Sequence, residues 1–481
     1  MGQPGKKGAP ARRESRAERA LLAVAAGAVL TGLLLRLGAA RGDLWLDELW
    51  SLYIASVARS PFDVLWSIHH DNNNYLNTLW MLVVGGGAPP ILYRMLAVAS
   101  GLGAVAVAAA APLRPGRLES AVAAVLMALS CFMVHYGSEA RGYGPAMFFA
   151  LASFVSLDRF LRTRQRRWAV AFAVTASLGV LSHLTFLLVL AGAFSWAAFE
   201  LARRRDAKLA DCALLGAPLL LVAFLWLVDI RFLEVGGAPS TLLAGSLRLL
   251  LSKTFGLPPG PLELLAVGFV GAAAYELLCM AREGDSRAIF FGALFAAPVI
   301  SLVAWRPDYA FPRHFAVLVP FTLVLAAGGL TRLARLGRWG VAIAGLALAV
   351  FALGNGIQIA LLLRDGRGRY RDAVELMLAR STDRAVTIGA GNDFRVRMVL
   401  DDQARRLGVS DRIVFIERAN LASHNPEWMI YQDPVERPGT AQFPQLLELA
   451  NTRYALTGIF PYGGLSGFSW ILYRRLPEPS R

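Results

Sequence analysis

Long apolar runs separated by short basic clusters constrain this chain more than any other feature of its sequence. Of its 481 residues, 56% are hydrophobic and only 17% are charged. Many of the apolar runs approach the ~20 residues that an α-helix needs to cross a bilayer. Because lipid cannot satisfy free backbone polar groups, such runs must fold as helices. The pattern predicts a polytopic α-helical membrane protein with about eleven spans, at residues 20–41, 91–111, 118–136, 144–160, 168–182, 185–201, 210–229, 262–281, 288–305, 315–331 and 339–363.

The basic residues orient these spans. Residues 1–19 are rich in Lys and Arg and are expected to form a cytoplasmic arm. The later basic clusters fall on the same side only if the short apolar piece 76–84 lies in the interface without crossing. The N-terminus is then cytoplasmic, and the first loop, residues 42–90, faces the periplasm across a bacterial inner membrane. The transmembrane module is expected to span residues 20–363.

Two alternative interpretations of this pattern fit less well. A formal net charge of +15 would suit a nucleic-acid-binding protein, but the basic residues lie between apolar runs, as positive-inside topology requires. We therefore expect no nucleic-acid partner. Residues 20–41 also resemble a cleaved signal peptide, yet the run is long for one and Arg36 interrupts its end. An uncleaved first span is favoured.

The composition changes after the last span. Residues 364–481 are charged and contain no run of membrane length. Short helical and strand patterns alternate there, including a helix expected at residues 443–451, which predicts a small α/β domain outside the membrane on the periplasmic side.

The unusual polar residues gather on one membrane face once the spans are oriented. Adjacent carboxylates follow the first span, a His-rich segment precedes Tyr75, and further charged residues stand at the ends of later spans. Charges at such depth are costly and therefore indicate function. The candidate site residues are Asp47, Glu48, His69, His70, Asp71, Glu139, Arg141, Tyr143, His183, Arg306, Arg313 and His314.

These residue types suit group transfer from a membrane-embedded phosphate donor. A carboxylate at Asp47 or Glu48 would deprotonate the acceptor. Guanidinium groups at Arg141, Arg313 and Arg306 would bind the donor phosphate at two points and stabilise it as it leaves. The remaining candidates, the His residues with Asp71, Glu139 and Tyr143, would bind substrate. No metal-ligand spacing demands a metal and the sequence does not decide whether a divalent cation is needed; Asp47, Glu48 and His69 offer ligands that such a cation would accept.

Each of these features also has a purely structural interpretation. The carboxylates can be a charge pair at a helix start, and the Asn-rich segment after His70 can cap the helix at Tyr75. Glu139 and Arg141 can form an internal ion pair, the later arginines can snorkel to headgroups, and His183 can be a buried structural residue.

Five short motifs resemble the C-type (GT-C, multi-spanning) glycosyltransferases, in the protein-mannosyltransferase and aminoarabinose-transferase branch (glycosyltransferase family 39/83-like). They are Trp45-Leu-Asp-Glu-Leu49, the His-containing segment that runs into Tyr75, Ser138-Glu-Ala-Arg-Gly-Tyr143, Ser182-His-Leu-Thr-Phe186 and Pro312-Arg-His-Phe315, which occur in the family's order. The resemblance implies an inverting transferase that takes a sugar from a polyprenyl phosphate. It also implies that Asp47 is the base and that Arg141 and Arg313 contact the donor phosphate.

The chain departs from the family in two places. His70-Asp-Asn-Asn-Asn-Tyr75 replaces a His-Pro-Pro-Leu-Tyr-Tyr stretch, and His314 stands where Tyr is usual. Both departures bear on the choice of sugar or of acceptor, which is expected to be an envelope lipid, glycan or protein.

Two other classes of function compete with a transferase. A transporter or flippase of an anionic or polyprenyl lipid should place charges near the bilayer midplane and show paired halves. The charges here lie at one surface, and no half resembles the other. A membrane-anchored binding protein would not need so many spans.

Overall fold

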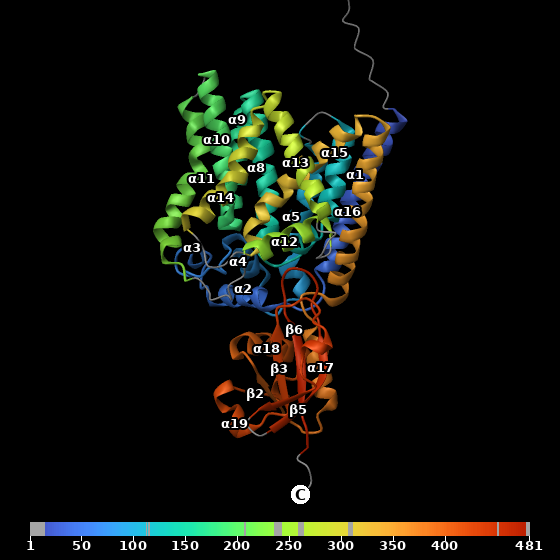
Figure 1. The fold of residues 1–481 in the computed structure, drawn as a ribbon. Coiled ribbons are helices and arrows are strands. Elements are labelled where there is room, and N and C mark those ends of the chain that lie inside the picture. Colours follow the sequence, from blue (N-terminus) through green and yellow to red (C-terminus); the bar gives the residue numbers. More distant parts are fainter. Residues whose placement is uncertain are drawn as a thin grey trace, which may run out of the picture.

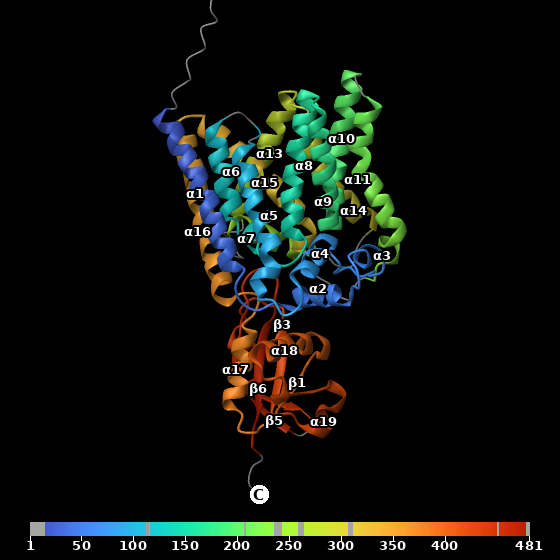
Figure 2. The same cartoon turned by 180° about the vertical axis from the view of Figure 1, so that it is seen from behind.

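The protein consists of a helical bundle with a smaller α/β domain at one end of it (Figure 1; Figure 2). The structure, a computed structural model, describes residues 15–111, 113, 116–205, 208–234, 243–257, 264–305, 311–449 and 452–477. Most of the basic arm expected at residues 1–19 lies outside the described residues, and its last four residues begin the first helix. The bundle helices are α1 (Arg16–Ala39), α5 (Pro90–Ala110), α6 (Arg117–Leu129), α7 (Cys131–Tyr136), α8 (Tyr143–Thr163), α9 (Arg166–Ser182), α10 (Leu187–Arg204), α11 (Leu209–Val228), α13 (Leu264–Arg282), α14 (Arg287–Trp305), α15 (Val319–Ala334) and α16 (Arg338–Asp365).

Within the described part of the chain, nine helical stretches are long and apolar enough to cross a membrane. This confirms a multi-pass helical membrane protein. The remaining two expected spans are also helical but shorter. Residues 118–136 divide at Ser130 into α6 and α7, and α9 has 17 residues. The count of eleven spans stays a prediction.

The first loop folds into three short helices beneath the bundle, α2 (Leu46–Val57), α3 (Asp63–Trp66) and α4 (Tyr75–Val84). Two adjacent acidic residues in the first turn of α2 favour a helix start there because they interact with the helix dipole. Helix α4 is apolar but has only 10 residues, which is too short to cross a bilayer. Another short helix, α12 (Leu243–Phe255), lies against the lower part of the bundle (Figure 1).

The C-terminal domain is a mixed six-stranded sheet with helices, in the strand order β2-β1-β3-β6-β5-β4. Strand β1 pairs in parallel with β2 and β3, and the other pairings are antiparallel. The elements are α17 (Tyr370–Arg380), β1 (Val386–Ala390), α18 (Asp393–Leu407), β2 (Ile413–Ile416), α19 (Leu421–His424), β3 (Trp428–Asp433), β4 (Leu446–Leu449), β5 (Thr452–Phe460) and β6 (Ser469–Arg475).

The expected helix at residues 443–451 is wrong. Residues Leu446–Leu449 form strand β4, which pairs with Thr452–Ala455 of β5. The leucines of this segment have a high helix propensity. Four residues are too few for a stable helix, however, and pairing at the sheet edge decides their conformation.

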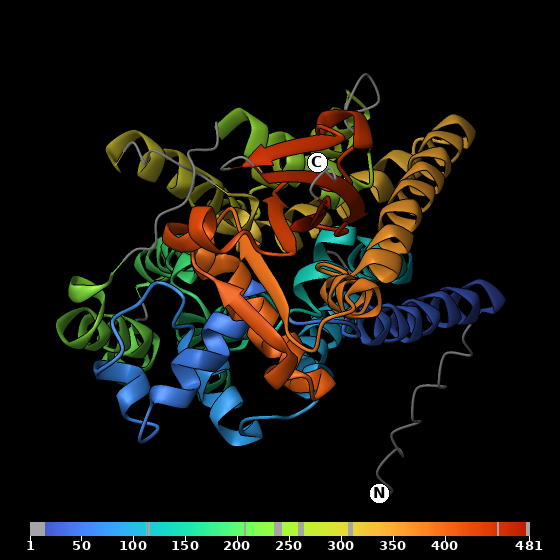
Figure 3. The ribbon, with the colours of Figure 1, turned by 90° about the horizontal axis from the view of Figure 1, so that it is seen from below.

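One buried hydrophobic cluster joins the first loop to the C-terminal domain. Leu44, Trp45 and Leu49 share it with Tyr370 and Trp470. Seen from below, the domain covers part of the first loop (Figure 3). The loop is therefore packed between bundle and domain, and its conformation depends on both.

Candidate active site at the junction of bundle and first loop

Three charged side chains from distant parts of the chain meet at the start of α2. The Oδ2 atom of Asp47 lies 2.9 Å from Nη1 of Arg141 and 3.3 Å from Nη1 of Arg313. Arg141 lies in the turn between α7 and α8, and Arg313 lies in the 3₁₀ helix η4 (Pro312–Leu318) that precedes α15. The structure thus brings together the three residues that the motifs single out.

Asn72 fixes the relative position of Asp47 and Arg141. Its Nδ2 donates to the Asp47 carbonyl at 3.0 Å and to Ser51 Oγ at 2.8 Å, while its Oδ1 accepts from Arg141 Nη1. One hydrogen-bond donor of Arg141 is unused: its Nε is buried and has no hydrogen-bond partner within the described part of the chain. Since a buried donor without a partner is costly, this nitrogen favours an anionic ligand.

Glu48 has a different environment from its neighbour Asp47. Its side chain is fully buried, with Oε2 2.6 Å from Arg94 Nη2 and Oε1 accepting from Arg94 Nε and the Ala140 amide at 2.8 Å each. Burial alone would raise the pKa of Glu48, but the charge and hydrogen bonds of Arg94 bring it below the ordinary value. This geometry does not support the expected catalytic role for Glu48, because the carboxylate is occupied and has no access to a substrate.

A cavity of about 290 Å³ opens beside Arg141 and Arg313. Most of the remaining candidate residues line it, as do asparagines that precede α4 and residues near the end of α9. The lining includes His70, Asp71, Asn73, Asn74, Tyr75, Arg141, Tyr143, Ser182, His183, Thr185, Arg313 and His314. The lining also includes Leu181, Leu184, Leu233 and Phe311, and a pocket that combines apolar walls with a few polar groups is typical of a small-molecule site.

His183 and Tyr143 form an aromatic wall of this cavity. Their ring centroids are 4.5 Å apart, and the Arg141 guanidinium lies 5.6 Å from the Tyr143 ring. Burial, together with the neighbouring Arg141, His314 and Arg313, lowers the pKa of His183 to about 3. Its Nδ1 accepts a hydrogen bond from the Thr185 amide at 3.2 Å, which is consistent with a neutral imidazole.

His69 and His70, adjacent in sequence, have different partners. His69 Nδ1 lies 2.6 Å from Asp229 Oδ1, and the Tyr75 hydroxyl donates to Asp229 Oδ2 at 2.5 Å. This arrangement attaches the first loop to the end of α11, and His69 does not line the cavity. His70 does line it and accepts from Trp50 Nε1 at 3.1 Å.

Glu139 is not among the residues that line the cavity. It is buried and contacts residues of the first loop, α7 and the C-terminal domain. Arg306, expected at the donor phosphate, lies outside the described residues.

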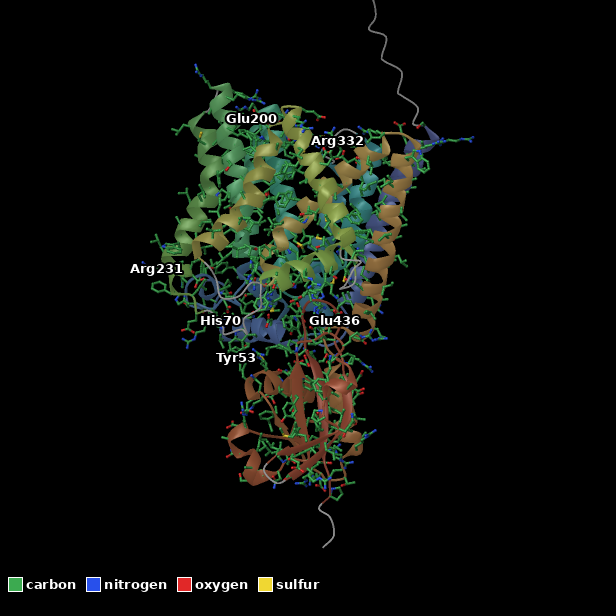
Figure 4. All side chains as sticks on the ribbon, in the orientation of Figure 1. Tyr53, His70, Glu200, Arg231, Arg332 and Glu436 are labelled. Atoms are coloured by element: carbon green, nitrogen blue, oxygen red, sulfur yellow. The ribbon has the colours of Figure 1, made fainter. Side chains whose placement is uncertain are left out.

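Polar groups are not confined to this end of the molecule. Glu200 and Arg332 lie at the opposite end of the bundle, whereas His70 and Glu436 lie at the end that faces the C-terminal domain (Figure 4). Glu200 pairs with Arg203 and Arg204, and Arg332 pairs with Glu276 and Glu283. The polar cavity itself belongs to the end that carries the first loop.

The three residues considered as cation ligands do not converge. Glu48 contacts Arg94, His69 contacts Asp229, and Asp47 contacts the two arginines. Among the described residues, no group of three His, Cys, Asp or Glu side chains is arranged to hold a metal ion.

A second, apolar groove of about 370 Å³ lies next to the far end of η4. Leu318 and Val319, which directly follow the Arg313 turn, form part of its wall. The remaining lining comes from α12, α13, α14 and α15 and includes Leu250, Leu251, Thr254, Phe255, Val270, Ala273, Ala274, Leu277, Phe295, Thr322 and Leu325. Such a surface accepts a hydrocarbon chain and offers few polar partners.

Several residues that organise the site were not identified from the sequence. Arg94 lies inside an expected span, and a charge at that depth needs a buried partner. Its position in the sequence could therefore have indicated a buried ion pair. Asp229 at the end of α11 carried the same signal. Asn72 could not be distinguished from its neighbours Asn73 and Asn74, because only the folded geometry shows which amide reaches Arg141.

No family model and no curated protein sequence matches this chain. Two solved structures resemble it over nearly its full length. The apo form of ArnT from Cupriavidus metallidurans superposes with a TM-score of 0.54 and 12% identity, covering 95% of this chain and 98% of that chain. ArnT bound to undecaprenyl phosphate superposes with a TM-score of 0.50 and 14% identity, covering 96% and 100%. These likenesses confirm the GT-C fold that the five motifs predict.

Proposed function

We propose that this protein is a glycosyltransferase that moves a sugar from a polyprenyl phosphate to an acceptor of the cell envelope. The observation that carries the proposal is the contact of Asp47 with both Arg141 and Arg313, two arginines that line the cavity. The fold supports it, since ArnT has that fold and one of its structures contains undecaprenyl phosphate.

Asp47 is the proposed base. It takes a proton from an acceptor hydroxyl or amine as that group attacks the anomeric carbon of the donor sugar. The bond between the anomeric carbon and the phosphate oxygen breaks, and polyprenyl phosphate leaves with the electron pair. Attack from the face opposite the phosphate inverts the anomeric configuration.

Arg141 and Arg313 are the proposed phosphate ligands. Two guanidinium groups within 3.3 Å of one carboxylate oxygen mark a position where an anion is strongly favoured. A phosphate at that position would use the unpartnered Nε of Arg141 and replace the contacts to Asp47. The carboxylate would then be free to accept a proton.

The apolar groove is the proposed site of the lipid chain. Its residues Leu318 and Val319 follow Arg313 by five and six positions, and a 3₁₀ helix rises about 2 Å per residue. A phosphate at Arg313 would therefore lie about 10 Å from the groove, a distance that the first isoprene units span. Tyr143, His183 and His314 would contact the sugar in the polar cavity.

A lipid transporter is the alternative, and one assay separates the two. Purified protein is incubated with a polyprenyl phosphate-hexose and an envelope lipid extract, and both products are followed by mass spectrometry. We expect free polyprenyl phosphate and a sugar-bearing product from the wild type and neither from Asp47→Asn. Movement of the intact donor across proteoliposomes without cleavage would support a transporter and overturn the transferase.

A further inference from the structure

Glu139 connects four separate parts of the chain through one buried carboxylate. Its Oε1 accepts from Trp45 Nε1 at 3.2 Å, and its Oε2 accepts from the Ser466 hydroxyl at 3.0 Å. His135 Nε2 lies 3.1 Å and Arg367 Nε 3.7 Å from Oε2. Ser466 belongs to the connection between β5 and β6, and Arg367 follows α16, so two of the four partners come from beyond the bundle.

Arg367 ties the ends of two bundle helices together. Its side chain is fully buried and donates from Nη1 to the Ala39 carbonyl at 3.1 Å and from Nη2 to the His135 carbonyl at 2.8 Å. A third bond, 3.2 Å long, joins Nη2 to Ser138 Oγ. Arg367 therefore holds the end of α7, where the turn that carries Arg141 begins.

The β5–β6 connection is shaped to fit against this network, and it extends up from the sheet to the bundle (Figure 1). Gly464 has φ +104°, and a Cβ there would come within 2.5 Å of His135 Nδ1. Gly467 has φ +133°, and a Cβ there would collide with the Arg367 carbonyl. Only glycine combines these backbone angles with so close an approach, so the loop is built for this contact.

The turn from Glu139 to Arg141 is short and held on both sides. The Arg141 amide donates to the Glu139 carbonyl at 2.7 Å, and the Ala140 amide donates to Glu48 at 2.8 Å. A displacement of Glu139 must therefore move Arg141. Such a displacement would also alter the 2.9 Å contact between Arg141 and Asp47.

We infer that Arg367 and Ser466 are positioning residues that orient Arg141 through Glu139, so that the C-terminal domain completes the phosphate site. Neither residue lines the cavity, so both act at a distance from the substrate. The inference rests on the proposed function, because Arg141 is taken as a phosphate ligand. It gives the C-terminal domain a part in donor binding that does not require it to touch the donor.

The test compares donor-lipid affinity with thermal stability in full-length protein. Binding of undecaprenyl phosphate in detergent is titrated by intrinsic tryptophan fluorescence for Ser466→Ala, Arg367→Lys and Glu139→Gln. We expect about tenfold weaker binding in each, because small misplacements of a site residue have large effects. Ser466→Thr keeps the hydroxyl and should retain the wild-type affinity. The double variant Ser466→Ala/Glu139→Gln should bind no more weakly than Glu139→Gln, because Ser466 is inferred to act only through its hydrogen bond to Glu139.

The matched control is Arg437→Met. Arg437 Nε lies 3.1 Å from Asp365 and also joins the domain to the bundle, but it does not contact Glu139. We expect this variant to lower the melting temperature about as much as Ser466→Ala while leaving the affinity unchanged. Wild-type affinity in both Ser466→Ala and Arg367→Lys would overturn the positioning role and leave the proposed function intact. Failure of the wild type to bind undecaprenyl phosphate would overturn the proposed function, and the positioning role with it.

Discussion

The carboxylate of Glu48 lies 2.6 Å from the guanidinium of Arg94, and neither side chain is exposed to solvent. This ion pair separates the roles of two adjacent acidic residues. Glu48 holds the start of α2 against α5, so Asp47 is presented to Arg141 and Arg313.

Replacing Asp47 by Asn should abolish transfer without unfolding the protein. Loss of a general base lowers rates by a factor of about 100 or more, whereas the amide keeps the shape of the side chain. Sugar release from a polyprenyl phosphate donor measures the effect. Asp63→Asn is the control, since the Asp63 carboxylate accepts from the amides of Arg59 and Ser60 and contacts neither Arg141 nor Arg313 among the described residues; its rate should stay near that of the wild type. A wild-type rate for Asp47→Asn would exclude Asp47 as the base.

Replacing Glu48 by Gln should lower the free energy of unfolding of the protein. It leaves the Arg94 charge buried without its counter-ion, a change that costs about 3 kcal/mol or more. Differential scanning fluorimetry in detergent should show a clearly lower melting temperature. Glu375→Gln breaks an exposed pair with Arg371 and should change little. The double variant Glu48→Met/Arg94→Met should recover part of the loss; no recovery would mean that the pair is not the cause.

Replacing Arg141 or Arg313 by Lys should weaken donor binding while the positive charge remains. An ammonium group cannot bind a phosphate through two parallel hydrogen bonds. We expect about tenfold weaker binding of undecaprenyl phosphate for each variant. Arg371→Lys, on the exposed face of α17, is the control. If both site variants bind as tightly as the wild type, the phosphate lies elsewhere.

Filling the apolar groove should discriminate between donors by chain length. Ala274 is on its wall, and Ala274→Trp would occupy much of the space. Long-chain polyprenyl phosphates should lose affinity, while a donor with a single short prenyl chain should not. Val303→Trp places the same indole side chain at an exposed position on α14 and should leave the affinities for long and short donors unchanged. Equal losses for long and short chains would show that the chain does not enter this groove.

His183 should make the protein sensitive to acid. Its pKa is about 3 in the folded state because of burial and nearby arginines, against an ordinary value of 6.5. Between these two values the unfolded chain binds a proton that the folded chain does not, so stability falls as the pH falls through this window. His183→Gln should flatten the dependence of melting temperature on pH between about 6.5 and 3. His424→Gln, at an exposed position, should leave the dependence as it is, and an unchanged slope in His183→Gln would contradict the assignment.

The sequence was sufficient for the class of fold and for about half of the residues at the site, among them His70, Asp71, Tyr143, His183 and His314 on the cavity wall. Apolar runs predict helices in lipid whatever their tertiary contacts, because the bilayer leaves no alternative. The polar segments could be assigned to one face because the basic residues predict a direction for each span. Asp47, Arg141 and Arg313 lie together for this reason, although they are far apart in the sequence.

The sequence could not separate Asp47 from Glu48. Which of two adjacent helical residues faces a site depends on how the helix is rotated against its neighbours, and Arg94 sets that rotation here. Strand β4 was missed for a related reason, since pairing with β5 overrides the helix propensity of its leucines. Contacts such as Ser466 to Glu139 join positions 327 residues apart, and no local pattern reports them.

The contact between Ser466 and Glu139 also has a consequence for biosynthesis. Ser466 follows every helix of the bundle in the chain, so the ribosome makes it after the membrane part is complete. A nascent chain can insert all of its helices and still lack the hydroxyl that donates to Glu139. If Ser466 positions Arg141 as inferred, the donor site is complete only after the β5–β6 connection has been translated and folded, and a chain cut short before it should bind the donor lipid more weakly.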